Sequence, residues 1–552
     1  MAKHLSGSCP ASMALVALLL SEPALAQVAT PSSVWTVQTE QAIEWLRFLP
    51  SHLLLISSDD GLRAVDPADG SVRWRRTDLG NSSQVSFDAA QQAAPLPGAG
   101  NTKGGGPAPV IRLMEELPGG RLAAILADSA GKRTWFDVIE VETGETVWSS
   151  TTLALGEARG FLLFPDSTTI LVYGSMIEPG RNRRLWARIE AATGKTLWIT
   201  DSLLLDSPSQ FDATGMAASR GTINGNQPLV ALPDSTILLN ASTDGLVRFE
   251  GGTGRVRWRA PLATGQVGPI GQGYAPFVVS GDTAYIPSAR FIDAIHFSSG
   301  RRLWSSGPLA TITTQAIATS GGLLVRGQPL TLAGEDPRSQ RPFAALLDSR
   351  TGKPRWRKDF NRGAGLTPFL VTGETALIGS DEGLLRLFLA SAEVSEVTSG
   401  KLPGKPAATL EMRDDAILLG AAQSLTLLGS DGTQRYQHEF PAPSLSLGGR
   451  LLRIALSAAA IAGGAYYSGG YLAGSAFAKY QYSTSAYLSQ YAFFVLKDHD
   501  NQGPALARID KATGEIVAVV TLHGDKTPEY VIDAYSGLLV LKSDKSLVAY
   551  RW

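Results

Sequence analysis

The chain has 552 residues, of which 58 are glycine, 44% are hydrophobic and 18% are charged, so it is long enough for one large domain or several smaller ones. Its 49 basic and 50 acidic residues give a formal net charge of −1. Binding to nucleic acid phosphates draws on a basic excess that this chain lacks, so we expect no nucleic-acid partner.

The first 26 residues have the layout of a secretory signal peptide. Lys3 and His4 precede an apolar stretch from Met13 to Leu20, and Ala24-Leu25-Ala26 has the small-x-small arrangement that a signal peptidase accepts. We therefore expect residues 1–26 to be removed and an exported chain to begin near Gln27.

The single cysteine, Cys9, lies inside this expected signal. The residues before it, Ser6-Gly7-Ser8, lack the leucine expected three positions before a lipidated cysteine, which argues against a lipid anchor. The mature chain would contain no cysteine, so it would depend on its core instead of disulfides for stability.

From residue 66 onward a short pattern returns eight times, with an acidic residue, a glycine four positions later and a tryptophan four positions after that. Recurrence at roughly 50 residues is typical of propellers and solenoids, because each unit must stack on its neighbours to bury its apolar face. The last two copies are eroded and the fifth has His in place of the acid. The copies are Asp66/Gly70/Trp74, Glu140/Gly144/Trp148, Glu190/Gly194/Trp198, Glu250/Gly254/Trp258, His296/Gly300/Trp304, Asp348/Gly352/Trp356, Gly432/Tyr436 and Asp510/Gly514/Ala518.

Each copy predicts a β-hairpin. An apolar residue stands five positions before the glycine, and Thr, Ser or Asp stands just before it, as in Ile189 and Thr193. The glycine supplies the positive φ of a short turn, and the acid accepts hydrogen bonds from the turn amides. The tryptophan would lie on the outer strand against the next sheet, with its N–H free to find an acceptor.

A second tight turn precedes several of these hairpins, at Asp60-Gly61, Asp244-Gly245 and Glu382-Gly383. Each unit therefore holds at least three strands, and units of that kind close radially into a β-propeller. The repeat resembles the pyrroloquinoline-quinone-like propeller repeats, whose hallmark is apolar-Asp-x-x-Thr-Gly-x-x-x-Trp, in the superfamily of BamB-like and quinoprotein-dehydrogenase-like proteins. We predict an all-β fold, a single propeller spanning residues 27–552 with about eight four-stranded blades, seven and nine being alternatives.

Two further features bear on the blade count. Residues Leu387 to Val394 are a candidate for a ninth, eroded unit, because the spacing between Gly352 and Gly432 is well above the usual one. Trp35 to Leu46 would supply a strand that closes the ring with the C-terminal strand, since closure removes exposed edges.

Two insertions interrupt the regular spacing of the repeat. Residues 87–109 are rich in Gly, Pro and Ala, which predicts a flexible loop. Residues 451–491 form an apolar insertion that carries no charge between Arg453 and Lys479 and ends in a Tyr-rich tract. Three interpretations of its segment 454–478 stay open, namely packing on the propeller, contact with a membrane surface or a partner, and a membrane span.

No sequence motif identifies a catalytic or metal site. Gly194-Lys195-Thr196 lacks the first glycine of a phosphate-binding loop, because Ile189 stands in its place, and it belongs to the third repeat. Asp498 to Gly503 begins like a calcium loop, but Ile509 stands where the bidentate Glu belongs. The six histidines have no zinc-like spacing. We assign no catalytic residue and no metal ligand, and the cofactor-binding residues stay unknown.

Two functional classes then compete. The first is a non-catalytic exported scaffold in the cell envelope, periplasmic or associated with the outer membrane, that binds envelope proteins and takes part in outer-membrane assembly. The second, implied by the resemblance to quinoproteins, is an oxidoreductase that binds pyrroloquinoline quinone (PQQ) with calcium, or another small ligand, near the propeller axis. Many of those enzymes stack the quinone on a disulfide, which the mature chain cannot form. We favour the scaffold, with no cofactor.

Overall fold

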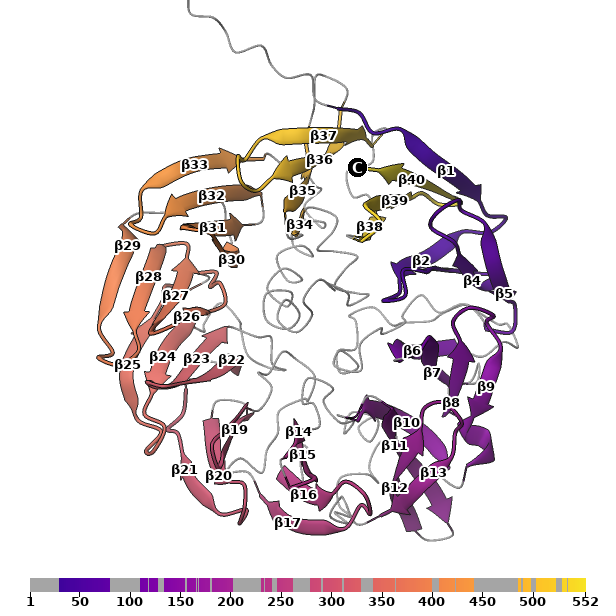
Figure 1. Cartoon of the computed structure of the whole chain (residues 1–552), viewed down its shortest axis with the longest axis horizontal. Coiled ribbons are helices and arrows are strands. Elements are labelled where there is room, and N and C mark those ends of the chain that lie inside the picture. The colour runs from indigo at the N-terminus through magenta and orange to yellow at the C-terminus, as the bar shows by residue number, and fades with distance from the viewer. Residues whose placement is uncertain are drawn as a thin grey trace, which may run out of the picture.

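The computed structural model of the chain is a ring of ten four-stranded antiparallel sheets, which makes it a ten-bladed β-propeller (Figure 1). It describes residues 29–79, 110–127, 134–201, 230–261, 278–328, 341–399, 407–440, 485–522 and 529–552, apart from gaps of at most five residues inside these ranges. In nine of the ten blades the strands follow one another along the chain from the axis to the rim.

Each of the first five blades is a continuous stretch of chain, with its inner strand first and its outer strand last. These blades are β2 (Ile43–Phe48), β3 (Leu54–Ser58), β4 (Gly61–Val65) and β5 (Val72–Arg76); β6 (Val110–Leu117), β7 (Arg121–Ala127), β8 (Thr134–Glu140) and β9 (Thr146–Ser149); β10 (Glu157–Leu163), β11 (Thr169–Glu178), β12 (Arg181–Glu190) and β13 (Thr196–Thr200); β14 (Val230–Ala231), β15 (Thr236–Asn240), β16 (Leu246–Glu250) and β17 (Val256–Ala260); and β18 (Val278–Ser280), β19 (Thr283–Ser288), β20 (Phe291–His296) and β21 (Arg302–Ser305). A single turn of 3₁₀ helix, η2 (Ser150–Thr152), follows β9.

The second half of the ring has the same plan. Its blades are β22 (Ile312–Thr319), β23 (Gly322–Gln328), β24 (Phe343–Leu347) and β25 (Pro354–Asp359); β26 (Leu370–Thr372), β27 (Thr375–Ser380), β28 (Gly383–Phe388) and β29 (Val394–Ser399); β30 (Ala407–Arg413), β31 (Ala416–Ala421), β32 (Ser424–Gly429) and β33 (Gln434–Glu439); β34 (Ser485–Tyr487), β35 (Tyr491–Leu496), β36 (Ala505–Asp510) and β37 (Ile516–Thr521); and β38 (Glu529–Asp533), β39 (Leu538–Lys542), β40 (Ser546–Arg551) and β1 (Ser33–Gln38).

The two ends of the chain share the tenth blade. β1 pairs antiparallel with β40, so that Trp35 lies opposite Ala549, and β1 is the outer strand of a sheet whose other three strands are C-terminal. The predicted closing strand is thereby confirmed for residues 33–38, whereas residues 43–48 form the inner strand of the first blade.

The prediction of about eight blades was wrong, as were the alternatives of seven and nine, and two physical reasons account for the difference. The tenth blade has no turn between its third and fourth strands, because those strands come from opposite ends of the chain, so no motif marks it. The turn of the seventh blade, after β28, has Ala392 in the left-handed region (φ 61°) where the other copies have glycine, so its motif is eroded. The candidate ninth unit at Leu387 to Val394 is this blade.

The hydrophobic core lies between the blades, and each seam of the ring contains its own cluster of buried residues. Leu54 and Val65 of the first blade pack with Val540 and Leu547 of the tenth, for example. Because the sheets stand radially, both faces of each blade are covered, which explains why second and third strands such as β3 and β4 are buried along their whole length. The ring is a single closed body that removes most strand edges from solvent.

Several sequence predictions concern residues that the structure does not describe. The expected signal peptide 1–26, the loop 87–109 and the segment 454–478 lie outside the described residues. At the end of the range 451–491, Ser485–Tyr487 forms the inner strand of the ninth blade. Within the part of the chain that the structure describes, no helix is long and apolar enough to cross a membrane.

Candidate functional site on the loop face and the blade seams

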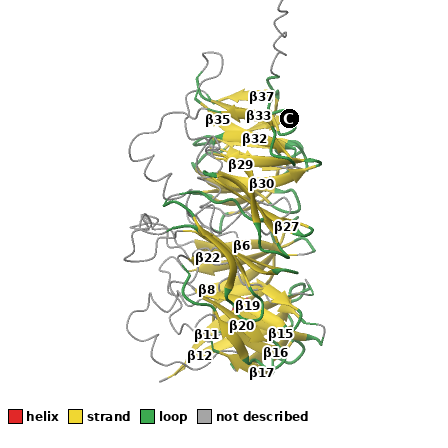
Figure 2. Ribbon diagram, turned by 90° about the vertical axis from the view of Figure 1, so that its left-hand side faces the viewer, coloured by secondary structure: helices red, strands yellow, loops and turns green. Residues whose placement is uncertain are grey.

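The ring has two unlike faces, which we call the turn face and the loop face. Because strands alternate in direction, the first-to-second and third-to-fourth connections of every blade lie on the turn face, and the remaining connections lie on the loop face. No connection on the turn face exceeds six residues, as in 66–71. Every long connection joins strand ends on the loop face, and these are residues 77–109, 201–229, 261–277, 329–342 and 440–484. Figure 2 shows the ring edge-on.

The tryptophans of the repeat join neighbouring blades. In six consecutive seams, the indole Nε1 donates to the backbone oxygen that follows the acidic position of the next blade, at 2.6 to 3.0 Å. The bonds run from Trp35 to Pro67, Trp74 to Val141, Trp148 to Ala191, Trp198 to Gly251, Trp258 to Phe297 and Trp304 to Ser349. The predicted place of the tryptophan, against the next sheet with its N–H bonded, is confirmed.

The motif glycine has a second role beyond its positive φ. Gly300 (φ 71°) lies under the Trp258 ring of the preceding blade, and a Cβ atom added there would come within 2.7 Å of Trp258 Cδ2. The same relation joins Gly144 to Trp74 and Gly194 to Trp148. The glycine therefore permits both the turn and the close approach of the neighbouring indole.

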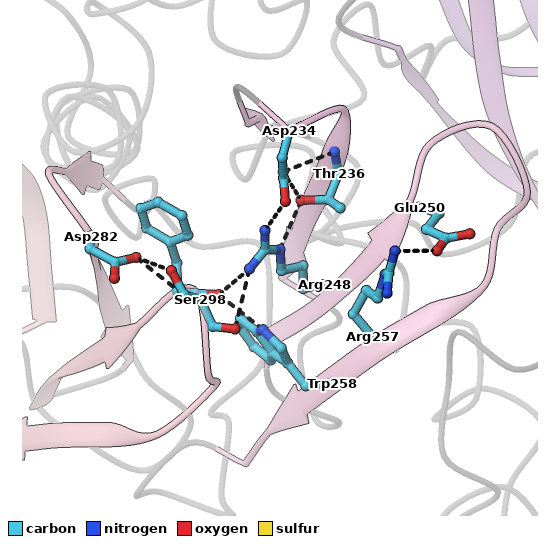
Figure 3. Close-up of polar contacts among 9 residues, drawn as sticks. Asp234, Thr236, Arg248, Glu250, Arg257, Trp258, Asp282 and Ser298 are labelled. Carbon is cyan, nitrogen blue, oxygen red and sulfur yellow. Dashed lines mark hydrogen bonds and ion pairs between the residues drawn. The ribbon is translucent and has the colours of Figure 1, made fainter.

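Arg248 adds a polar network to the seam between the fourth and fifth blades (Figure 3). Its Nε donates to Thr236 Oγ1 at 2.8 Å, and its Nη2 forms an ion pair with Asp234. Its Nη1 donates at 2.9 Å to the same Phe297 oxygen that accepts from Trp258. Burial of the Arg248 side chain, which is 9% exposed, makes this network a fixed part of the seam.

Arg188 repeats this arrangement one blade earlier. It donates to Thr169 Oγ1 and to the Gly251 oxygen, both at 2.9 Å, and pairs with Asp166. Trp198 donates to the same Gly251 oxygen. The two arginines stand six positions before the motif glycine, a column that sequence reasoning missed although Arg386 and Arg508 occupy it in later copies.

Arginines on the rim are paired with acids of their own blade. Arg255 Nη2 and Arg257 Nη2 lie 2.5 and 2.6 Å from Glu250 Oε1. Two hydrogen bonds lower the pKa of Glu250 to about 2, and the bond from Arg255 has a larger effect than the bond from Thr253. Arg73 pairs with Asp66 in the same way. The local role predicted for the acid is confirmed at Asp66, Asp348 and Asp510, whose carboxylates accept hydrogen bonds from turn amides, and the arginine pairs are a further contact of the acid.

The seam between the eighth and ninth blades is held by different contacts. Tyr436 replaces the tryptophan, and its hydroxyl donates to the Lys511 oxygen at 2.5 Å. The Lys511 side chain is 1% exposed, and its Nζ donates to both carboxylate oxygens of Glu411 at 2.7 and 2.8 Å. Burial lowers the pKa of Lys511 and outweighs the opposing effect of Glu411. A buried ion pair therefore lies in this seam near the turn face, where Lys511 begins the turn between β36 and β37.

A buried polar cluster lies on the loop face between the sixth and seventh blades. Gln315 Oε1 accepts from the Phe369 amide, and Arg326 Nη1 donates to the Leu366 oxygen, both at 2.9 Å. Gln315 Nε2 and Thr313 Oγ1 are buried and have no hydrogen-bond partner among the described residues. The cluster fixes the connection 360–369 against the ring and leaves two buried donors beside it.

The structure locates several of the motifs and histidines that the sequence analysis did not accept as functional sites. Gly194-Lys195-Thr196 is the turn before β13, with Gly194 at φ 73°, which confirms its assignment to the third repeat. Residues 498–502 lie outside the described residues. His52 Nδ1 is 3.3 Å from Asp533 Oδ1 on the turn face, whereas His296 lies in the turn of the fifth blade, 2.6 Å from Asp282.

The calcium site expected of a quinoprotein would need several ligating side chains in one place. Among the described residues, no three His, Cys, Asp or Glu side chains are grouped so that they could hold a metal ion. The sequence contains a single cysteine, Cys9, and so no cysteine pair on which a quinone could stack.

Part of the chain matches a family model, and the chain is similar to several solved structures. Residues 132–328 match the family model of the outer membrane protein assembly factor BamB. A comparison with curated proteins gives no match. Among solved structures, BamB from Moraxella catarrhalis is 12% identical, with 71% of this chain and 93% of that chain covered and a TM-score of 0.33. Quinohemoprotein alcohol dehydrogenase from Comamonas testosteroni is 12% identical, with 78% and 81% covered and a TM-score of 0.35.

The radial sheets and the repeated seam contacts define a β-propeller built from one blade motif. The matched segment runs from β8 to the end of β23, and so contains both partners of three of the six tryptophan bonds, those of Trp148, Trp198 and Trp258. Residues 132–328 are similar to the BamB family, in agreement with the resemblance to PQQ-like propeller repeats that the sequence predicted.

Proposed function

We propose that this protein is a non-catalytic scaffold, exported to the cell envelope, that binds protein partners through its loop face. The observation that carries the proposal is the asymmetry of the ring, since every long connection joins strand ends on one face. Loops on a rigid framework are where binding residues concentrate, whereas short turns serve the framework itself.

The polar residues at the seams support the same proposal. Arg188, Arg248 and Lys511 are bound to the neighbouring blade or to acids of the framework, so they hold the ring together and are not directed at a substrate. The match of residues 132–328 to the family of the outer membrane protein assembly factor BamB also supports the proposal of a protein-binding role in outer-membrane assembly and of a periplasmic or outer-membrane location.

Site-specific crosslinking tests the proposal. A photo-crosslinking amino acid is placed at Arg362, which is exposed on the loop face, and in a separate variant at Tyr535, which is 82% exposed on the turn face. In intact cells we expect a discrete crosslinked protein from position 362 and none from position 535. Equal crosslinking from both positions, or from position 535 alone, would overturn the assignment of the loop face.

The role of the apolar insertion is tested in the same cells. Replacing residues 455–477 by a short Gly-Ser link removes the uncharged segment without touching a described strand. If the segment forms part of the docking surface, the crosslink from Arg362 is lost, whereas a crosslink that survives shows that the partner binds the rest of the loop face.

The competing function is a small-ligand or quinone-dependent oxidoreductase. The buried donors Gln315 Nε2 and Thr313 Oγ1 favour it, because they would suit a ligand that carries carbonyl or carboxylate oxygens. Purified protein mixed with the quinone and calcium should show neither tight binding nor dye-linked oxidation of alcohols or sugars. A clear signal in either measurement would replace the scaffold by the enzyme.

A further inference from the structure

The outer strand of the ninth blade differs from those of the other blades. β37 begins with five consecutive apolar residues, IVAVV, and no other outer strand has more than three in a row. The outer strands of the first, fourth and sixth blades instead place arginines on both sides of the tryptophan, as Arg257 and Arg259 flank Trp258. Charged side chains on an edge strand discourage pairing with another chain.

The edge of β37 is therefore the one that most resembles a template for strand addition. Six- to seven-residue segments with high β-propensity, no charge and no proline pair readily with another strand when their edge is exposed. Val519 and Val520 are buried against the ring, so the hydrogen-bonding edge, and not the side chains, is what a further strand would use.

The N-terminal segment already covers part of this edge. Ala29 forms a parallel bridge with Ala518, and the Val519 amide donates to the Ala29 oxygen at 3.0 Å. The chain then enters β1, four residues later, as the outer strand of the neighbouring tenth blade. A single N-terminal stretch thus spans two outer edges, pairing in parallel with one and antiparallel with the other.

We propose that the outer edge of β37 is a strand-addition site, occupied in the free protein by the chain's own N-terminal segment and able to accept the same segment of a second copy when its own is displaced. The occupant is set by the contact itself, because the N-terminal segment supplies the backbone oxygen that the Val519 amide binds. Exchange of this short element between copies would link two rings without altering the core of either.

Two measurements test the site. The first uses a truncated variant that begins at Pro31, which keeps β1 but has no backbone oxygen at position 29 to bind the Val519 amide. A fluorescent peptide of residues 27–36 should bind this variant at least tenfold more tightly than the intact protein, as followed by fluorescence anisotropy. The matched control is the same peptide with an ester in place of the amide between Ala29 and Thr30, which weakens the Ala29 acceptor and should lower the affinity.

The second measurement does not depend on the peptide. Hydrogen exchange at the Val519 amide should become at least tenfold faster in the deletion variant, while amides of β36, such as that of Ala507, keep their protection and show that the blade is folded. Light scattering should show concentration-dependent dimers of the intact protein and none of the variant, because the variant lacks the segment that is exchanged. Equal binding of both peptides, no binding to the variant, unchanged exchange at Val519, or association of the variant equal to that of the intact protein would each overturn the proposal.

Discussion

The indole of Trp258 donates a 2.9 Å hydrogen bond to the backbone oxygen of Phe297, across the seam between the fourth and fifth blades. The two residues belong to successive copies of the same motif, so the bond ties each copy to the next. Gly300 completes the contact by letting the indole approach the turn. Six consecutive seams repeat this bond. The motif therefore joins neighbouring blades as well as forming a hairpin turn.

Trp258→Phe should reveal the strength of one seam bond. Phenylalanine keeps an aromatic ring against the next blade but has no N–H, so the free energy of unfolding should fall by about 1 kcal/mol from the lost hydrogen bond. Urea unfolding followed by circular dichroism measures the change. The matched control is Trp356→Phe, because Trp356 makes no such bond among the described residues and Arg355 donates to the carbonyls of Leu389 and Ala390 instead. Equal losses in both variants would show that the indole N–H contributes nothing.

Gly300→Ala should destabilise the ring more than Gly281→Ala. Both glycines have positive φ, 71° and 56°, so each alanine brings a backbone cost of about 1 to 2 kcal/mol. Only at Gly300 would the new Cβ meet a neighbour, the Trp258 ring, whereas at Gly281 nothing lies within 4 Å. Overpacking should add roughly 1 to 3 kcal/mol at Gly300. Thermal unfolding of the two variants side by side measures the difference, and equal shifts would contradict it.

Most of the fold could be predicted from the repeat, because the turn and the tryptophan stand at fixed spacing on one short stretch of chain. The blade count could not, since the tenth blade joins Trp35 to Ala549, residues more than 500 positions apart, and no local pattern reports that pairing. The seventh blade was hidden because Ala392 takes the backbone conformation that marks the other copies by glycine.

Less of the candidate site than of the fold could be predicted from the sequence. Arg248 was available as a recurring arginine six positions before the motif glycine, but its acceptor, Phe297, lies in the next blade. The asymmetry of the two faces follows from strand order once each blade is known to have four strands. Gln315 gives no sequence signal, because a lone glutamine becomes informative only when its burial is known.

The carboxylate of Glu250 should titrate far below an ordinary glutamate. Its pKa is lowered from 4.5 to about 2 by hydrogen bonds from Arg255 and Thr253. A lowered folded-state pKa contributes stability that is present above pH 4.5 and is lost as the pH falls towards 2. Carbon-13 NMR titration of labelled glutamate measures the pKa. Arg255→Gln should raise it towards 4.5, whereas Arg301→Gln, at the same place in the next copy, should leave it unchanged. Because the pair is exposed, high salt should weaken the effect.

The buried pair of Lys511 and Glu411 should also make the free energy of unfolding rise with pH, but in an alkaline window instead of an acidic one. Burial lowers the pKa of Lys511 below its ordinary value of 10.5. Between the lowered pKa and 10.5 the unfolded chain binds more protons than the folded one, so the free energy of unfolding rises with pH across that window. Urea unfolding at about pH 7 to 10 should show this rise in the intact protein relative to Lys511→Met, in which the other titrating groups are the same.

Removing only the carboxylate separates the charge of this lysine from its packing. Glu411→Ala leaves a buried ammonium without its partner and should cost about 3 to 5 kcal/mol at pH 7, whereas Lys511→Met leaves the carboxylate of Glu411, 30% exposed, in contact with water and should cost much less. In Glu411→Gln the pKa of Lys511 should fall further, because the charge that raised it is gone, and the pH window should widen towards neutrality. Two results would contradict this role of the ion pair in the stability of the seam. One is a loss of unfolding free energy in Lys511→Met as large as that in Glu411→Ala, and the other is an unchanged pH dependence in Lys511→Met.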